Sequence, residues 1–331
     1  MNRQLFVRSL LAAAIGGLAC AAGAQAQAVV KLTLGHGAAI GNPRHEASVR
    51  FAEVAKARSG GRIEVQVAPS AQLGDDAAMV TALRTGALDM SANSQGAVAN
   101  AVPEYAAFGM PFLFSSPAAA FKLLDGPLGK ELADRSAEKG LVLLGTWDNG
   151  IRQMTNSKRP INTVEDMKGL KMRVPPDATL VDIMKALGAE SQQVKFAELY
   201  VALQQGVVDG QENPLVNIHA SKLYEVQKYL ALTNHQFQMT PLLISKRTWD
   251  KLSDADRKAV QEAAAEATAL QRRLSQEADG KLLDELKAKG VQVSTPDKAA
   301  FSKATADVTA KWEAGPVGAY VKKVVAAAQG N

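Results

Sequence analysis

Polar side chains that could bind a small anion stand at the ends of six predicted strands. The strand segments are VVKLTLGH, RIEVQVA, ALDMSA, LVLLGTWDNG, GLKMR and VDGQEN. The polar residues at or just beyond their ends are His36, Gln72, Asp76, Asn93, Gln95, Arg152, Arg173 and Asn213. Ligands of α/β proteins bind at the carboxyl ends of strands, and a planar guanidinium matches a carboxylate. The pattern therefore predicts a site for a small carboxylate.

Arg173 is the most informative of these residues, although its local pattern favours solvent. Leu170, Met172 and Val174 alternate with Lys171 and Arg173. Alternation with a period of two places the apolar side chains on one face of a strand and both cations on the other. Taken alone, this pattern predicts an exposed or salt-bridged arginine.

Other chemistries fit the sequence poorly. The segment GHGAAIG spaces its glycines one residue too far apart for a dinucleotide fingerprint. The four histidines form no metalloprotease motif, and neither a G-x-S-x-G elbow nor a P-loop occurs. Asp75 and Asp76 are explained as acids that compensate the dipole of a helix start. We expect no catalytic residues, no metal and no cofactor, and therefore no enzyme.

The elements that must position the candidate residues alternate between strand and helix. Strands at 29–37, 62–68 and 87–94 are separated by helices at 42–59 and 75–86. The second half continues with strands at 141–150 and 169–174, a helix at 178–187, a helix from 196 that Gly206 ends, and a short strand before Pro214. This order predicts mostly parallel sheets flanked by helices.

A long helical pattern from Ser253 to Gly290 begins with a capping box, Ser253 to Asp256. Its apolar residues recur at helical spacing, interrupted only by Gly280. Such a helix is either a coiled-coil arm or a brace across two domains.

The N-terminus predicts a secretory signal peptide over residues 1–28. Two arginines precede an apolar run and then Ala-Gln-Ala twice, which places cleavage after Ala26 or Ala28. Cys20 is the only cysteine, so the mature chain is expected to have no disulfide. About 300 remaining residues predict two domains.

Charge argues against a nucleic-acid partner. Two of the 38 Lys and Arg residues lie in the leader, which leaves 36 against 33 acidic residues, with no dense basic tract. The partner is expected to be a small molecule, and the mature protein is not expected to be embedded in a membrane.

The motifs QLGDD, DNGIRQMTN, DMKGLKMRVP, VDGQENP and YEVQKYLALTNH resemble the DctP-type solute-binding proteins of tripartite ATP-independent periplasmic (TRAP) transporters. The resemblance covers essentially the whole mature chain in order. It implies a monomeric two-domain clamshell in the periplasm, with a long helix across both domains, that delivers an organic acid to a membrane permease. We assign residues 29–150 plus about 239–278 to domain I, and 151–238 plus about 279–331 to domain II.

By the same resemblance, Arg173 grips the ligand carboxylate, with help from Arg152 and Asn213. The remaining candidates, in the other motifs and among the few aromatic residues, are His36, Gln72, Asp76, Asn93, Gln95, Trp147 and Phe196. The aromatic content is only 5%, which favours a polar, hydroxylated ligand.

We expect a sugar acid of the hexuronate type, such as glucuronate or galacturonate, with C4-dicarboxylates and 2-oxo or hydroxy acids as rivals. A ligand-presenting sensor subunit and a secreted enzyme on the same clamshell are the alternative functions.

Overall fold

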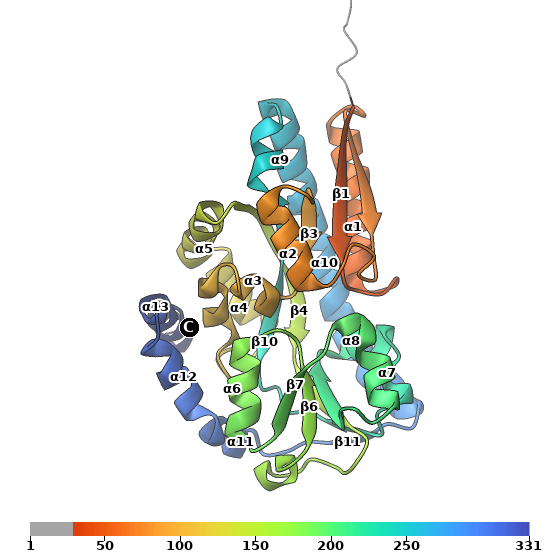
Figure 1. Ribbon diagram of the computed structural model, residues 1–331, viewed down its shortest axis with the longest axis vertical. Coiled ribbons are helices and arrows are strands. Elements are labelled where there is room, and N and C mark those ends of the chain that lie inside the picture. Colours follow the sequence, from red (N-terminus) through yellow and green to blue (C-terminus); the bar gives the residue numbers. More distant parts are fainter. Residues whose placement is uncertain (1–28, 331) are drawn as a thin grey trace, which may run out of the picture.

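Two β-sheets organise the chain, and helices cover each of them (Figure 1). The computed structural model describes residues 29–330, so the predicted signal peptide lies outside the described residues. The first sheet has the order β2-β1-β3-β10-β4. Its strands are β1 (Val30–His36), β2 (Ile63–Ala68), β3 (Met90–Ala92), β4 (Leu141–Ile151) and β10 (Phe237–Ser245). β1 pairs in parallel with β2 and β3, whereas β10 is antiparallel to β3 and β4.

The second sheet has the order β11-β9-β5-β8-β6-β7. Its strands are β5 (Gln153–Asn156), β6 (Lys171–Val174), β7 (Glu190–Gln193), β8 (Gly210–Asn213), β9 (Tyr229–Ala231) and β11 (Gln292–Ser294). β6 is parallel to β7 and β8, β11 is parallel to β9, and β5 is antiparallel to β8 and β9. The predicted α/β class, with mixed and mostly parallel sheets, is confirmed.

Helices follow most strands, as the alternating pattern predicted. Those that accompany the first sheet are α1 (Pro43–Arg58), α2 (Asp76–Thr85), α3 (Gln95–Ala99), η1 (Pro103–Gly109), α4 (Pro117–Leu124), α5 (Pro127–Glu138) and α9 (Lys246–Lys251). The other helices that follow β5 along the chain, apart from the long helix described next, are η2 (Val164–Met167), α6 (Ala178–Ala186), η3 (Phe196–Glu198), α7 (Leu199–Gln204), α8 (Leu215–Ala220), η4 (Leu223–Glu225), α11 (Lys298–Ala304), α12 (Ala306–Glu313) and α13 (Gly318–Gln329).

The long helix α10 (Asp254–Ala288) is a brace and not an isolated arm. Ser253 caps it by accepting a hydrogen bond from the Asp256 N–H at 3.2 Å. Its first half packs into the core of the first sheet through residues such as Ala263, and its second half packs beside the second sheet through Leu282. The part of the molecule built on the first sheet is called the first half, and the part built on the second sheet is called the second half. One continuous helix therefore contacts both halves (Figure 1).

Two further segments connect the halves. The chain leaves the first sheet after Ile151 and returns to it at Phe237. Where these segments pass each other, the Arg152 N–H donates to the Gln236 carbonyl at 2.8 Å. This pair of hydrogen-bonded segments and α10 therefore join the halves, and the chain crosses between them once more from α12 to α13.

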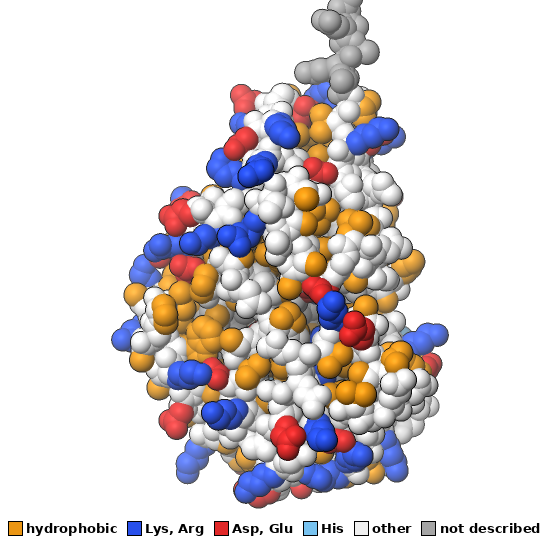
Figure 2. All heavy atoms as spheres, in the orientation of Figure 1, with side chains coloured by type: hydrophobic (Ala, Val, Ile, Leu, Met, Phe, Trp, Pro, Cys, Tyr) orange, Lys and Arg blue, Asp and Glu red, His pale blue; other side chains and the backbone are white. Residues whose placement is uncertain are grey.

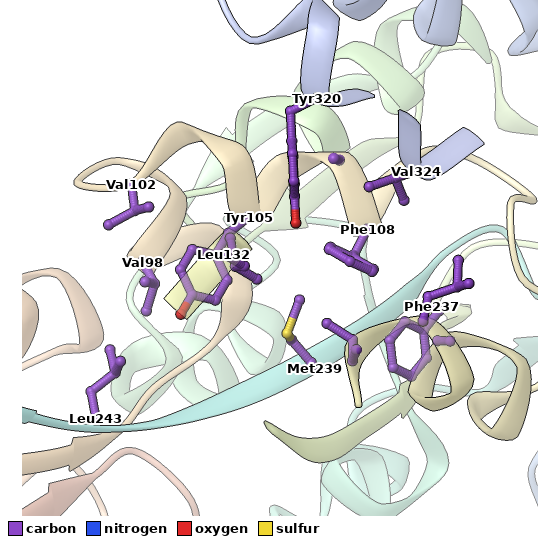
Figure 3. Packing of buried hydrophobic residues seen from close by; sticks show 14 of the residues in the cluster. Val98, Val102, Tyr105, Phe108, Leu132, Phe237, Met239, Leu243, Tyr320 and Val324 are labelled. Carbon is purple, nitrogen blue, oxygen red and sulfur yellow. The ribbon is translucent and has the colours of Figure 1, made fainter. Parts of the chain in front are cut away.

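The C-terminal helix α13 packs on the first half, whereas the sequence assigned residues 279–331 to domain II. Tyr320 and Val324 lie in one cluster with Tyr105 and Phe108 of η1 (Figure 3). The Tyr320 hydroxyl also donates to the Leu128 carbonyl at 2.7 Å. The chain therefore returns to the first half after α12 because the apolar face of α13 is buried there.

Candidate functional site

A cavity of about 260 Å³ lies between the two halves. Loops after β1, β2 and β3 line one side, and loops after β6, β7 and β8 line the other. Its polar and charged lining residues are Arg44, Asp75, Asp76, Ser94, Asn149, Arg152, Arg173, Gln193, Lys195, Asn213, Asn217 and Gln238. These loops follow the carboxyl ends of strands, where the sequence predicted a ligand site.

Arg173 lines this cavity at the end of β6, and the expectation of a solvent-exposed side chain is wrong. The residue is only 2% exposed, because the second half packs around its strand and the cavity closes over its end. Its Nε donates to the Val194 carbonyl at 2.8 Å, and its guanidinium lies 5.7 Å from the centre of the Phe196 ring. Among residues 29–330, Arg173 has no carboxylate partner within salt-bridge distance. The rest of its guanidinium is free to bind an anion.

Burial lowers the pKa of Arg173 to about 10, an effect that the negative charge of Glu212 opposes. A guanidinium with that pKa remains protonated at neutral pH. The group is therefore a desolvated cation beside an open space, an arrangement that strengthens attraction to an anionic ligand.

Arg152 lines the same cavity, but its charge is already compensated. It forms a buried, bidentate ion pair with Glu212 of β8, and its Nη1 donates to Gln238 Oε1 at 2.9 Å. Burial alone raises the pKa of Glu212, but Arg152 and His235 outweigh it and hold that pKa below its usual value. Arg152 can still orient a ligand, whereas most of its charge is used within the protein.

Arg44 is a cavity residue that the sequence reasoning missed. It is the second residue of α1 and 7% exposed, and Asn42 caps the helix by accepting its N–H at 2.9 Å. Its Nη2 donates to Asn149 Oδ1 at 3.0 Å and to Thr240 Oγ1 at 2.8 Å. In the described part of the chain it has no carboxylate within salt-bridge distance. Its place after the loop that follows β1 is the available signal, although its local sequence pattern is that of an ordinary helix start.

A group of amide side chains, most of which line the cavity, joins the two halves. Asn217 of α8 donates to Asn213 Oδ1 at 3.1 Å and to Asn149 Oδ1 at 3.2 Å. Asn217 also accepts a hydrogen bond from Asn42 at 2.9 Å. The sequence predicted only Asn213 of this group. Amides can donate and accept, so they suit ligand hydroxyls.

The N-terminus of α2 forms another part of the wall. Asp75 caps the helix by accepting the Ala78 N–H at 2.9 Å, and it forms an ion pair with Lys195 of the second half at 3.2 Å. Asp76 accepts the Ser94 N–H at 2.8 Å. The predicted residue Asp76 therefore lies in the wall, and the pair Asp75–Lys195 joins the two halves at its edge.

Phe196 also lines the cavity, at the start of η3. Five other predicted residues are not part of the lining. Asn93 is fully buried and donates to the Asp76 carbonyl at 3.2 Å, and buried Gln95 accepts the Met239 N–H at 3.1 Å. Both residues support the wall from behind. Gln72 is exposed in the loop before α2.

His36 and Trp147 are also fully buried away from the lining. His36 Nδ1 accepts the Ala38 N–H at 3.2 Å, and burial with nearby Arg44 lowers its pKa to about 3, so the ring is neutral. Trp147 belongs to the core between the first sheet and α10, and its Nε1 donates to Thr268 Oγ1 at 3.0 Å.

Within the described residues, no cluster of three or more His, Cys, Asp or Glu side chains could hold a metal ion. No helix in residues 29–330 is long and apolar enough to cross a membrane. On the face that Figure 2 presents, basic and acidic side chains are interspersed.

The chain is similar to known proteins in both sequence and structure. Residues 34–314 match the model of the DctP family, bacterial extracellular solute-binding protein, family 7. An uncharacterised protein, y4mM of Sinorhizobium fredii, is 51% identical over 284 residues, which are 86% of this chain and 52% of that protein. The chain therefore spans about half the length of that relative.

Three solved structures of similar proteins contain acids. DctPAm of Advenella mimigardefordensis, in complex with galactonate, is 35% identical, with a TM-score of 0.89 and coverage of 92% of this chain and 99% of that chain. A TRAP solute-binding protein of Sulfitobacter with β-D-galacturonate is 31% identical, with a TM-score of 0.87 and coverage of 91% and 100%. A third, from Sulfurospirillum deleyianum with succinate, is 33% identical, with a TM-score of 0.86 and coverage of 91% and 99%.

The family match spans most of the chain, and the similar structures share its two-domain clamshell. They confirm both the predicted family and the prediction that the protein is not an enzyme. The chain belongs to the DctP-type family of periplasmic solute-binding proteins of TRAP transporters.

Proposed function

We propose that this protein captures a sugar acid, first of all a hexuronate such as galacturonate or glucuronate, and delivers it to the membrane permease of a TRAP transporter. We also propose that it works in the periplasm, as its family members do. That it is a monomer stays a prediction.

Arg173 carries this proposal. It is a buried cation whose only side-chain hydrogen bond among residues 29–330 uses Nε, and it borders an open cavity. A ligand carboxylate can therefore pair with its free guanidinium nitrogens. Charge-assisted hydrogen bonds of this kind contribute about 1.5–3 kcal/mol each.

The rest of the lining suits hydroxyl groups. Asn149, Asn217 and Gln238 offer both donors and acceptors, and Asp76 offers acceptors only. A sugar acid presents one carboxylate and several hydroxyls. Its carboxylate can pair with Arg173, and its hydroxyls can form hydrogen bonds with the amides and with Asp76. The galactonate and galacturonate found in the similar structures have this composition.

A C4-dicarboxylate is the second candidate, because Arg44 and Arg173 both line the cavity without a carboxylate partner among the described residues. Succinate in one of the similar structures is consistent with it. We rank it second because a small diacid leaves most of the amide-bearing wall without a partner.

Isothermal titration calorimetry with galacturonate, glucuronate, galactonate and succinate tests the proposal. We expect a sugar acid to bind with 1:1 stoichiometry and to be recovered unchanged afterwards. Binding of succinate in the absence of any sugar-acid binding would refute the hexuronate assignment. Conversion of the bound acid to a product would refute the role in transport.

A further inference from the structure

The charged residues of the cavity lining do not all remain available to a ligand. Six of them line it: Arg44, Asp75, Asp76, Arg152, Arg173 and Lys195. Asp75 is paired with Lys195, and Arg152 is paired with Glu212 behind the wall. Arg44 and Arg173 are left as two cations, and Asp76 is left as one anion. The part of the cavity that is free to meet a ligand thus carries one net positive charge.

Asp76 occupies the place where a second anion would otherwise bind. It is the first residue of α2, and Asp75, Asp76 and Ala77 all face the cavity. The N-terminus of a helix attracts anions through its free N–H groups and its dipole. Here two carboxylates already fill that position, and one of them, Asp76, has no cation within salt-bridge distance among residues 29–330.

Asp76 also acts on both free arginines. Its negative charge raises the pKa of Arg44 and of Arg173, opposing the effect of their burial. It is held in place because its Oδ2 accepts the Ser94 N–H at 2.8 Å. A second carboxylate on the ligand would have to approach this fixed negative charge in a partly desolvated space, whereas a hydroxyl could donate to it.

We propose that Asp76 is the specificity-determining residue that admits acids with one carboxylate and rejects the corresponding diacids. The assignment rests on the proposed sugar-acid function and deepens it. The carboxylate of the ligand pairs with Arg173, and a hydroxyl at its other end donates to Asp76 beside Arg44.

The buried carboxylate of Asp177 works in the same direction. It lies outside the cavity lining, and its oxygens accept hydrogen bonds from the Thr179 N–H at 2.9 Å and from Gln238 Nε2 at 2.6 Å. It therefore offers no group to a ligand, and any charge on it would also repel a diacid.

Galacturonate and galactarate share a six-carbon skeleton and the C6 carboxylate; galacturonate closes C1 into a pyranose ring, whereas galactarate is an open chain with a second carboxylate at C1. The change in their affinity ratio between variants therefore reports on the charge at position 76, because the difference in ring closure is the same for every variant. The dissociation constants of both are measured by calorimetry for the wild type, Asp76→Asn and Asp134→Asn. Asparagine at position 76 keeps the acceptor for the Ser94 N–H and removes the charge. Asparagine at position 134 removes a charge on α5 that is paired with Lys130 and lies outside the cavity lining.

We expect the wild type to prefer galacturonate by at least about tenfold, as a like charge in a partly desolvated site requires. Asp76→Asn should reduce or reverse this ratio by a similar factor, and Asp134→Asn should leave the ratio unchanged. A thermal melt of each variant without ligand checks that it is folded.

The possible failures can be distinguished. If the wild type binds galacturonate and Asp76→Asn leaves the ratio unchanged, the role of Asp76 is wrong and the proposed function stands. If the wild type binds galactarate as well as galacturonate, the role of Asp76 is also wrong. If the wild type binds succinate but no sugar acid, or binds none of these acids, both proposals are wrong.

Discussion

Gly96 of α3 lies directly against Asp177, the residue that caps α6 on the other half of the molecule. A Cβ atom added to Gly96 would lie 2.6 Å from Asp177 Oδ2 and 2.7 Å from its Cγ. Beside this contact, Asn100 Nδ2 donates to the Pro176 carbonyl at 3.2 Å. The absence of a side chain at position 96 is therefore a condition for the two halves to meet here.

Gly96→Ala should weaken ligand binding at least about tenfold, because the methyl group holds the two halves apart and the closed cavity is lost. Calorimetry with the best-binding acid measures the effect. Gly280→Ala is the control, since a Cβ there has no neighbour within 4 Å. Equal affinities of the two variants would show that the contact at Gly96 does not limit closure.

Arg173→Lys should lower affinity for the ligand by about 10- to 100-fold, because an ammonium group keeps the charge but cannot form two parallel hydrogen bonds to a carboxylate. The melting temperature without ligand should change little, since the Arg173 side chain makes only one hydrogen bond among the described residues. Unchanged affinity would remove Arg173 from the carboxylate site.

Asp148 should make the protein less stable as the pH rises. Neither of its side-chain oxygens has a hydrogen-bond partner in the described part of the chain, and burial together with nearby Asp279 raises its pKa to about 7, although Arg272 opposes this. The pKa of an aspartate in an unfolded chain is about 4. Between about pH 4 and 7 the folded protein therefore holds a proton that the unfolded chain has lost, so the free energy of unfolding falls across this interval.

Asp148→Asn should remove most of this dependence. We expect equal melting temperatures for wild type and variant near pH 4 and a more stable variant at pH 8, by roughly 2–4 kcal/mol. Asp279→Asn should have a smaller effect in the same direction, because burial raises the pKa of Asp279 only to about 6. A wild type whose stability does not fall between pH 5 and 8 would contradict the assignment.

Lys195→Gln should speed ligand release two- to fivefold at low salt, and the difference should shrink at high salt. Lys195 pairs with Asp75 across the two halves, but its side chain is 61% exposed, so the pair contributes at most about 1 kcal/mol. Stopped-flow dissociation measures it. Lys158→Gln, which removes a pair with Asp209 inside the second half, is the matched control and should not change the release rate.

Trp147→Phe should leave ligand affinity unchanged and lower stability by about 1–3 kcal/mol. The indole is fully buried in the core and donates to Thr268, so the substitution removes packing and leaves a polar group without its partner. Denaturant unfolding and calorimetry on the same sample separate the two effects. A large loss of affinity would show that Trp147 does contribute to ligand binding.

The sequence predicted the strands and helices with clear periodicity, together with the position of Arg173 at the end of β6. It did not predict β10, because Phe237–Ser245 is buried along its whole length and contains Pro241, so it shows neither alternation nor the usual strand composition. Arg44 was missed because its local pattern is that of an ordinary helix start. The cavity lining also includes Gln238 of β10 and Asn217 of α8, which are far from Arg44 in the sequence and lie beside it only in the folded protein.

Trp147 lies in the core whereas Asn149, two residues later, lines the cavity, and this difference has a local cause. The pairing of β4 with β10 shifts between Gln238 and Met239. Gln238 pairs with Gly150 and Met239 pairs with Asp148, so Asn149 is an extra residue of β4 without a partner in β10. A bulge of this kind redirects side chains. Asn149 therefore reaches the cavity while Trp147 enters the core, which strict alternation along the strand cannot predict.

The position of β10 also dictates the order in which the molecule can be assembled. β10 lies between β3 and β4, so the first sheet remains in two pieces until residues 237–245 are available. A chain growing from its N-terminus has by then released all the strands of the second sheet except β11. Folding must therefore wait for pairings between distant segments, which makes it slow. The first sheet can therefore be completed only after most of the second half has been synthesised.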